Sequence, residues 1–492
     1  MTSASAPDHP AEGADPRGLD PAGSADPPGL DPAGSADPLG LDAAEMRLLG
    51  HWVVDRVIEH LEGLPEQPAV KTGSPAGLVA ALGGPPPEEG GDARQALEVL
   101  ADVALAHMQH GDHPRYFARV PSPSSFAAVL ADWLGTGFNA IAASWSGGSG
   151  PTTVELVALD WLRELVGLPL GTEGIMTSGG SAANLTALAA ARAAAGPGVC
   201  YLSDQTHSSI ARGLRALGFA ATHIRVLPSD EGQRLPPDAL AAAVRADVTA
   251  GRRPGFVVAT AGTTNTGAVD PLPELADLCR AEGLWLHVDG AYGAAAALCD
   301  SGRRALAGLE RADSLVLDPH KWLFQPYDLG CVFVTRPGVL ERAFTMTPEY
   351  LADVTGTGGE VDLRDRGLEL SRRARGLKLW LTFRVYGAAR LRDAVTHGIG
   401  LAEHAERLLA ADGRWEVVTP ASLGIVTFAL RGAGHEEHRA RAAELASGGY
   451  AAVTSTRVND RPALRLCTIN PRTSRGDIAG TLARLGVRVG EV

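Results

Sequence analysis

Cysteine is scarce in this chain of 492 residues: there are five, and no two of them form a CxxC pair. Scattered thiols in odd number argue against a disulfide framework and a zinc site, and they suit a reducing compartment. No apolar run is long enough to span a bilayer, and the N-terminus lacks the basic and apolar regions of a signal peptide. The formal net charge of −13 leaves no basic excess for nucleic acid. We therefore expect a cytoplasmic protein that holds no metal and binds neither membranes nor nucleic acid.

The first 41 residues contain little apolar mass that could be buried. The sequence ADPPGLDPAGS, at residues 25–35, recurs with small changes on both sides. Its proline and glycine residues interrupt helices and strands, and three short copies do not make a solenoid. We predict a disordered tail over residues 1–41, with no chemistry of its own.

Two helical patterns follow the tail. Asp42 is a suitable N-cap, and apolar residues then recur at helical spacing as far as Leu61. A Pro/Gly-rich stretch at 64–91 separates this pattern from a second one at 93–108. We therefore assign residues 42–120 to an N-terminal helical segment.

The middle of the chain alternates between Ala-rich helical segments and short apolar, β-branched runs. Three of the runs are residues 255–259, 284–288 and 314–317. This alternation is typical of α/β units around a mostly parallel sheet. The last part of the chain mixes strands and helices differently, which predicts a smaller α+β domain. The expected fold class is α/β, with a large domain at 121–370 and a small C-terminal domain at 371–492.

The segment Asp318-Pro-His-Lys-Trp322 directly follows the last of these runs. A lysine at the C-terminal end of a buried strand can present its amine to a cleft. Such an amine, desolvated and near cations, has a lowered pKa and can attack an aldehyde. Because most lysines are solvated surface charges, Lys321 becomes a candidate only through the motifs that accompany it.

A second apolar run ends at Asp289. This carboxylate should lie at the same sheet edge as Lys321. Pyridoxal 5′-phosphate (PLP), an aldehyde cofactor, needs a carboxylate against its pyridine nitrogen, because the protonated ring then accepts electrons from the substrate Cα. A lone Asp after a strand is commonly a turn residue or an N-cap, and the presence of Lys321 is what favours a cofactor here.

Three polar loops complete the pattern. Residues 177–185 read TSGGSAANL and open an Ala-rich helix, whose first N–H groups can hold a phosphate. Residues 203–209 contain His207, which can stack on a flat ring, and residues 262–264 read GTT, whose hydroxyls can bond a cofactor oxygen. Each loop alone also fits an ordinary turn. Their order along the chain is that of a fold-type I PLP enzyme.

Five motifs resemble those of the group II pyridoxal-dependent decarboxylases, the family of aromatic-L-amino-acid decarboxylase, in order and spacing. They are His113-Pro-Arg-Tyr-Phe117, Ser203-Asp-Gln-Thr-His-Ser-Ser209, His287-Val-Asp289, Asp318-Pro-His-Lys-Trp322 and Ser371-Arg-Arg-Ala-Arg-Gly-Leu-Lys-Leu-Trp380. The resemblance covers the chain from about Asp42 onward. It implies the fold-type I PLP-dependent transferase fold and a homodimer with shared active sites, in which the N-terminal helices wrap the partner subunit.

The resemblance also implies roles for individual residues. Lys321 matches the lysine that forms a Schiff base with PLP, and Asp289 matches the partner of the pyridine nitrogen. His207 resembles the histidine stacked over the ring, and Ala291 the small residue beneath it. The other implied cofactor residues are Gly180, Ser181 and Asp318 at the phosphate, with Thr263 and His320 nearby. Asp318 stands where the animal enzyme has Asn, so its phosphate contact would have to run through the backbone or a water.

The implied reaction is the decarboxylation of an L-amino acid to the amine and CO₂, with an aromatic substrate as the first expectation. Three candidate substrate residues depart from the aromatic side chains of the family: Arg119, Ser122 and Ala143, the last contributed by the partner subunit. Arg119 faces either the pocket or the solvent. A pocket arginine would favour an acidic or polar substrate such as glutamate, aspartate or diaminobutyrate.

Tyr350 bears on the outcome of the reaction. In the family, a tyrosine at this position returns a proton to Cα, and a phenylalanine there leads to an aldehyde instead. A phenol can donate a proton and a phenyl ring cannot. We therefore expect a true decarboxylase with Lys321, Tyr350 and His207 as catalytic residues. The alternatives are a decarboxylation-dependent aldehyde synthase, a PLP lyase acting on a phosphorylated amino alcohol, and an inactive scaffold dimer.

Overall fold

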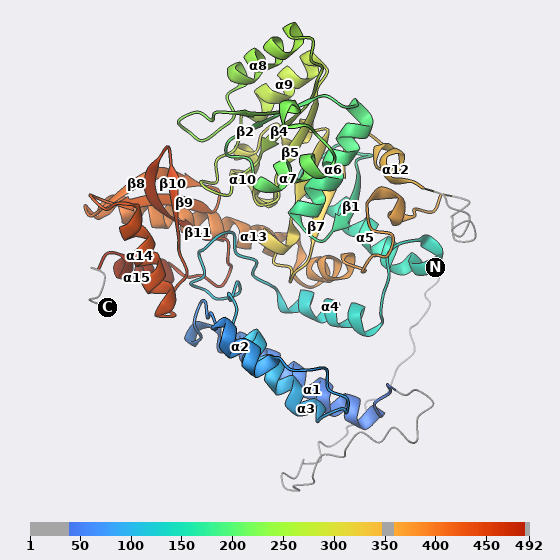
Figure 1. Ribbon diagram of the computed structural model, residues 1–492, viewed down its shortest axis with the longest axis vertical. Coiled ribbons are helices and arrows are strands. Elements are labelled where there is room, and N and C mark those ends of the chain that lie inside the picture. Colours follow the sequence, from blue (N-terminus) through green and yellow to red (C-terminus); the bar gives the residue numbers. More distant parts are fainter. Residues whose placement is uncertain (1–38, 347–358, 488–492) are drawn as a thin grey trace, which may run out of the picture.

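A computed structural model describes residues 39–346 and 359–487, so most of the predicted tail lies outside the described residues. The first described elements form an arm that projects from the body of the molecule (Figure 1). The arm contains α1 (Ala43–Glu62), α2 (Pro75–Leu82), α3 (Ala93–Val99) and a π-helical stretch (Leu100–Leu105). Asp42 caps α1 as expected, accepting bonds from Ala44 N and Glu45 N at 2.7 and 2.8 Å.

The Pro/Gly-rich stretch at 64–91, which separates the two predicted helical patterns, contains a helix of its own. It contains α2, because Pro75 is tolerated in the first helical turn and the Ser74 hydroxyl accepts a bond from Gly77 N at 3.1 Å. The predicted boundaries between domains, including the division at 370/371, remain predictions.

A seven-stranded sheet forms the centre of the molecule. Its strands are β1 (Glu173–Thr177), β2 (Val199–Ser203), β3 (Ile224–Leu227), β4 (Pro254–Thr260), β5 (Trp285–Asp289), β6 (Ser314–Leu317) and β7 (Gly330–Val334). Their order across the sheet is β1-β7-β6-β5-β4-β2-β3. The strands from β3 to β6 are parallel, and β7 runs antiparallel to both of its neighbours. The predicted α/β class with a mostly parallel sheet is confirmed.

Helices cover both faces of this sheet (Figure 1). The helices of this part of the chain are α4 (Phe126–Gly137), α5 (Trp145–Leu165), α6 (Gly180–Ala195), α7 (Ser208–Ala216), α8 (Pro237–Thr249), α9 (Leu272–Glu282), α10 (Asp300–Ala305), α11 (Pro319–Trp322) and α12 (Val339–Phe344). Successive residues of β4 point to opposite faces, as strand geometry requires. Phe256 packs in the core that contains Ala187 of α6, whereas Val257 packs in the core that contains Leu275 of α9.

The C-terminal part is a smaller layer of sheet and helices. Helix α13 (Gly376–Ala411) leads into it and is interrupted at Gly387, whose φ of 71° is left-handed. The antiparallel sheet has the order β10-β11-β9-β8. Its elements are β8 (Trp415–Ser422), β9 (Ile425–Leu430), β10 (Thr454–Val458) and β11 (Arg461–Cys467), covered by α14 (His435–Ser447) and α15 (Arg475–Leu485). Among the helices of the described ranges, none has the length and apolar character needed to cross a membrane.

Candidate active site

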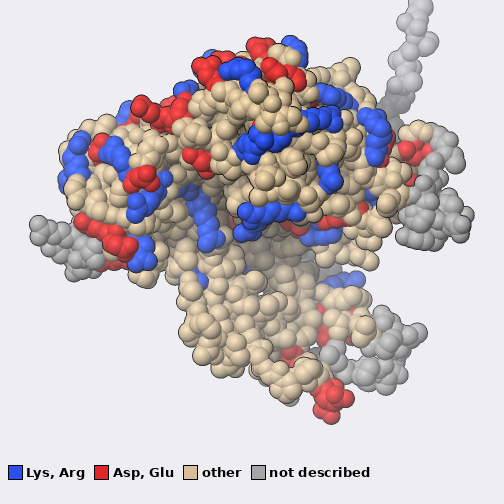
Figure 2. Space-filling view, turned by 45° about the horizontal axis from the view of Figure 1, so that its top comes forward, with Lys and Arg blue, Asp and Glu red and all other residues tan. Residues whose placement is uncertain are grey.

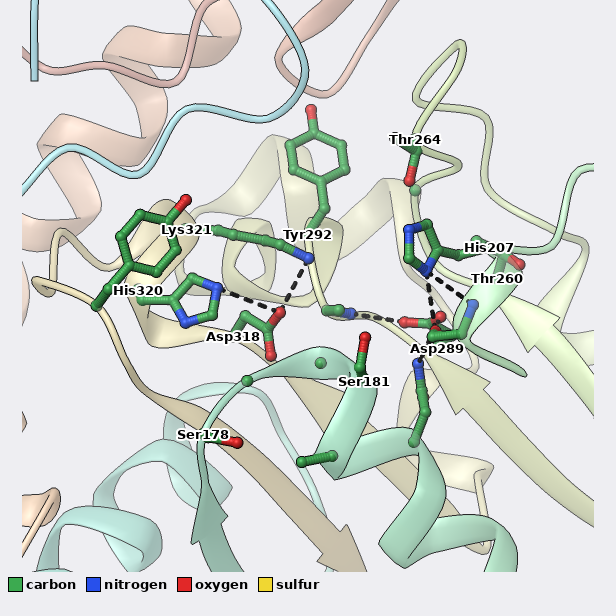
Figure 3. Close-up of a pocket in the computed structure, with 18 residues that line it drawn as sticks. Ser178, Ser181, His207, Thr260, Thr264, Asp289, Tyr292, Asp318, His320 and Lys321 are labelled. Atoms are coloured by element: carbon green, nitrogen blue, oxygen red, sulfur yellow. Dashed lines mark hydrogen bonds and ion pairs between the residues drawn. The ribbon is translucent and has the colours of Figure 1, made fainter. Parts of the chain in front are cut away.

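A cavity of about 360 Å³ lies where β4, β5 and β6 end, beside the N-terminus of α6 (Figure 3). This volume lies in the range of ordinary ligand pockets. Eight of the sequence-predicted residues line the cavity: Gly180, Ser181, His207, Asp289, Ala291, Asp318, His320 and Lys321. Strands β5 and β6 are adjacent and parallel, with Asp289 opposite Val316, so Asp289 and the segment that carries Lys321 meet at one sheet edge.

The Lys321 amine lies among carboxylates. Its Nζ is 2.9 Å from Asp318 Oδ2, and its side chain is 24% exposed toward the cavity. Burial lowers the pKa of Lys321, but the charges of Asp318 and Asp289 outweigh burial, and the net pKa is above the usual value for lysine. The lowered pKa expected from the sequence is therefore wrong, because the near neighbours are anions rather than cations.

Asp289 is almost fully buried, with 5% of its surface exposed, and lies at the floor of the cavity. Its Oδ1 accepts a bond from Ala291 N at 3.1 Å, and its Oδ2 accepts one from Asn184 Nδ2 at 3.0 Å. These two donors fix the orientation of the carboxylate. A carboxylate held in this way can pair with a protonated ring nitrogen.

The N-terminus of α6 forms a cradle that only small residues allow. Gly179 has φ 136° and ψ 178°, and a Cβ there would lie 2.8 Å from His320 Cε1. A Cβ on Gly180 would lie 2.6 Å from Asp318 Oδ2. The start of a 16-residue helix, with the Ser181 side chain beside it, suits a phosphate group. Together with Asp289 and the lysine amine, this cradle fits PLP.

Asp318 does not supply a hydrogen-bond donor to this cradle. Its carboxylate is 1% exposed and instead serves as the counterion of Lys321. The neighbouring His320 accepts a bond from Leu329 N at 3.1 Å through Nδ1, and its Nε2 is 3.6 Å from Asp318 Oδ2. Burial lowers the pKa of His320, although the charge of Asp318 opposes this effect.

Thr263 lies behind the cavity lining. Its hydroxyl is buried in a turn, 2.9 Å from Thr266 Oγ1, and accepts a bond from Ala268 N at 3.1 Å. Thr260 and Thr264 line the cavity instead. Thr263 was expected beside the cofactor, but it is its neighbour Thr264 whose side chain lines the cavity.

The three candidate substrate residues are not among those that line the cavity in this chain. Arg119 is exposed, has a φ of 51°, and donates from Nη1 to Gln109 Oε1 at 3.1 Å. Ser122 and Ala143 are buried elsewhere. Tyr350 lies outside the described residues.

Several lining residues were given no individual role from the sequence, among them Asn184, Ser209 and Tyr292, although Asn184 and Ser209 lie in two of the predicted cofactor loops. The Tyr292 ring stacks on Trp322 with centroids 5.3 Å apart, and its hydroxyl accepts a bond from Gly424 N at 2.8 Å. Tyr292 therefore joins the cavity to the C-terminal layer. Its position three residues after Asp289 was the available signal.

Comparisons with known proteins agree with this geometry. Residues 85–431 match the model of the pyridoxal-dependent decarboxylase conserved domain. An aromatic-L-amino-acid decarboxylase of Bacillus atrophaeus is 43% identical over 463 residues, which cover 92% of this chain and 96% of the relative. A tryptophan decarboxylase of Oryza sativa is 34% identical, over 86% of this chain and 89% of the relative.

Solved structures show the same likeness. The structure of Oryza sativa TDC with PLP and tryptamine superposes with a TM-score of 0.86 at 31% identity, over 90% of this chain and 97% of the other. That of Catharanthus roseus tryptophan decarboxylase with L-tryptophan has a TM-score of 0.85 at 30% identity, over 90% and 98%. The chain therefore belongs to the pyridoxal-dependent decarboxylases, and it is a PLP-dependent amino-acid decarboxylase.

Proposed function

We propose that this protein decarboxylates an aromatic L-amino acid to the corresponding amine. The observation that carries the proposal is the meeting of Lys321 and Asp289 in one cavity at the N-terminus of α6. The aromatic substrate is supported by the relatives, which include an aromatic-L-amino-acid decarboxylase and tryptophan and tyrosine decarboxylases. Arg119 gives no support for an acidic substrate, because its side chain is exposed and bonded to Gln109.

Each of the cavity residues has a separate role in binding the cofactor. When bound, PLP supplies a ring that accepts the electrons released at Cα as the carboxylate leaves. Lys321 would hold the cofactor through its amine, and Asp289 would keep the ring nitrogen protonated. The backbone at Gly180 and Ser181 would bind the phosphate. His207 would pack against the ring from the loop before α7.

Protonation of Cα is assigned to Tyr350. This role distinguishes a decarboxylase from an aldehyde synthase, and one solved relative at 28% identity is a 4-hydroxyphenylacetaldehyde synthase of Rhodiola rosea. Because a tyrosine hydroxyl can donate a proton, we assign the amine as the product.

A homodimer with shared sites belongs to the same proposal. Helices α1, α2 and α3 and the π-helical stretch of the arm contain no buried residue, and several large apolar side chains on them are exposed: Met46, Leu48, Val79, Leu82 and Leu105. On the face drawn in Figure 2, the projecting lower part of the molecule shows fewer charges than the body. An arm that exposes apolar side chains in this way suits a partner subunit. A cytoplasmic location remains a prediction.

A substrate panel tests the proposal. The PLP-loaded protein is incubated with L-tryptophan, L-tyrosine, L-dopa, L-glutamate, L-aspartate and L-2,4-diaminobutyrate, and CO₂, amine, aldehyde and peroxide are measured. We expect CO₂ and amine in equal amounts from one or more of the first three. Turnover confined to the last three would overturn the aromatic assignment, and aldehyde with peroxide would overturn the assignment of the product. The Lys321→Ala variant is the control and should release no CO₂.

A further inference from the structure

A buried chain of polar side chains lies behind the floor of the cavity. It runs through Trp285, Ser314, His287, Asn184 and Asp289. Its four links measure 2.9, 2.9, 3.0 and 3.0 Å, and no member is more than 5% exposed. Polar groups this deeply buried are costly unless each has a partner of the right kind. The chain therefore has to be consistent in the direction of every hydrogen bond.

The two ends of the chain fix that direction. The Trp285 indole N–H can only donate, and both oxygens of the Asp289 carboxylate accept hydrogen bonds. Asn184 must therefore turn its Nδ2 group toward Asp289, which leaves its Oδ1 facing His287 Nε2. Nε2 then carries the proton of His287, and Nδ1 accepts a bond from the Ser314 hydroxyl. Burial lowers the pKa of His287 to about 4, so the ring is neutral near pH 7 and has a single N–H to place.

A branch leads from Asn184 to a second wall of the cavity. The same Asn184 Nδ2 group donates to Ser209 Oγ at 3.1 Å, and Ser209 Oγ lies 2.9 Å from His207 Nδ1. Ser209 N also donates to His207 Nδ1, at 3.3 Å. Nδ1 of His207 is therefore an acceptor, and the ring N–H lies on Nε2. Figure 3 shows the two end points, Asp289 and His207, on the same side of the cavity.

We propose that Asn184 is a positioning residue, which holds the Asp289 carboxylate ionised and in place for the pyridine nitrogen of PLP and couples it to His207 through Ser209. Asn184 is positioned in turn by Trp285, Ser314 and His287. If any one hydrogen bond of this series were reversed, two donors or two acceptors would face each other. The inference rests on the proposed function for the role of Asp289, and it adds the residues that set the state of this carboxylate.

The decisive variant is Asn184→Asp, which preserves the shape of the side chain and replaces its donor by an acceptor. Two carboxylates would then share one buried site, and one of them would have to take up a proton. We expect the dissociation constant of PLP to rise by about tenfold or more, since like charges in one site disfavour the ionised form of Asp289. The thermal unfolding midpoint of the PLP-free protein should fall.

The double variant Asn184→Asp/Asp289→Asn distinguishes the effect of where the carboxylate lies from the effect of side-chain packing alone. It restores one carboxylate and one amide in the reverse arrangement, so that His287 still has an acceptor. The unfolding midpoint should return close to that of the wild type, while PLP affinity should stay at the low level of Asp289→Asn. Should Asn184→Asp alone fail to fold, recovery of folding in the double variant would support the proposal equally.

Asn470 provides a matched control, because it is also a buried asparagine, 1% exposed, that donates to backbone carbonyls of Asp112 and His113. Asn470→Asp should lower the midpoint but leave PLP affinity unchanged. Wild-type affinity for PLP in Asn184→Asp, or additive loss of stability in the double variant, would overturn the proposal. Failure of the wild type to bind PLP would instead overturn the proposed function, so the two failures are distinguishable.

Discussion

Replacement of Arg372 by methionine is expected to destabilise the fold, because it leaves the carboxylate of Glu155 buried without its charged partner. The two side chains are 1% and 0% exposed, with Nη2 of the arginine 2.7 Å from Oε1 of the glutamate. The same guanidinium donates to Met176 O at 2.6 Å and to Ala142 O at 2.5 Å. Met176 N donates to Glu155 Oε1 at 2.9 Å. The pair therefore joins α5, β1 and the segment before α13, next to the loop of Gly179.

The size of the effect follows from these contacts. Breaking a buried pair by removing one member costs about 3–5 kcal/mol, since the remaining charge has no compensation. In Glu155→Gln/Arg372→Met the buried charge is gone, and Gln can still accept from Met176 N. The double variant then loses mainly the two bonds to backbone carbonyls, at about 0.5–1.5 kcal/mol each. It should therefore be more stable than Arg372→Met alone.

Thermal unfolding of the PLP-free protein at one protein concentration measures this difference. We expect the midpoint of the double variant to lie above that of Arg372→Met. The exposed ion pair of Arg439 and Glu436 is the control, because side chains 67% and 77% exposed contribute little, and Arg439→Met should not move the midpoint. A double variant whose loss equals the sum of both single losses would refute the reasoning.

Three further predictions concern the cofactor, the product and pH. Asp289→Asn should leave a folded protein that binds PLP more weakly and turns over far more slowly, measured by PLP titration and CO₂ release; near-normal turnover would contradict the role of this carboxylate. Tyr350→Phe should lose the amine and gain aldehyde and peroxide, and a variant that still makes mainly amine would show that another group returns the proton. Burial and the charge of Arg115 lower the pKa of His113 to about 4, from about 6.5 in the unfolded chain. Between these two pH values the unfolded state therefore binds one proton more at His113 than the folded state does. The neutral His113 contributes about 3 kcal/mol to the free energy of unfolding above pH 6.5, and this contribution is lost as the pH falls toward 4. His113→Asn should reduce the drop of the unfolding midpoint between pH 7 and pH 4.5, and an unchanged drop would contradict this assignment.

The sequence predicted those elements whose pattern is contained in a few neighbouring residues. The strands ending at Asp289 and before Asp318 were recognisable because apolar, β-branched runs stop at polar residues, and parallel pairing then brings both ends to one sheet edge. The Asp42 cap was recognisable for a similar reason, since capping depends on the next few residues.

What the sequence did not reveal depends on contacts between distant segments or on single turn positions. Thr263 and Thr264 are adjacent, and only the path of the turn decides which one lines the cavity. The sign of the pKa shift of Lys321 depends on which charges surround it, and a buried strand end alone does not show that they are carboxylates. From the sequence, Asn184 cannot be distinguished from an ordinary helical residue, because its role depends on the packing of α6 against β5.

Reduction with borohydride tests the central claim most directly, because it makes the bond between PLP and its lysine permanent. The PLP-loaded protein is reduced, digested and mapped by mass spectrometry, with Lys321→Ala and Lys378→Ala treated in parallel. Lys378 is the matched control, since it is also a buried lysine, and its Nζ donates to Pro326 O at 3.1 Å away from the cavity lining. We predict that the cofactor is found on Lys321 in the wild type and in Lys378→Ala, and on no lysine in Lys321→Ala. Cofactor attached to any other lysine, or retained covalently in Lys321→Ala, would contradict the account.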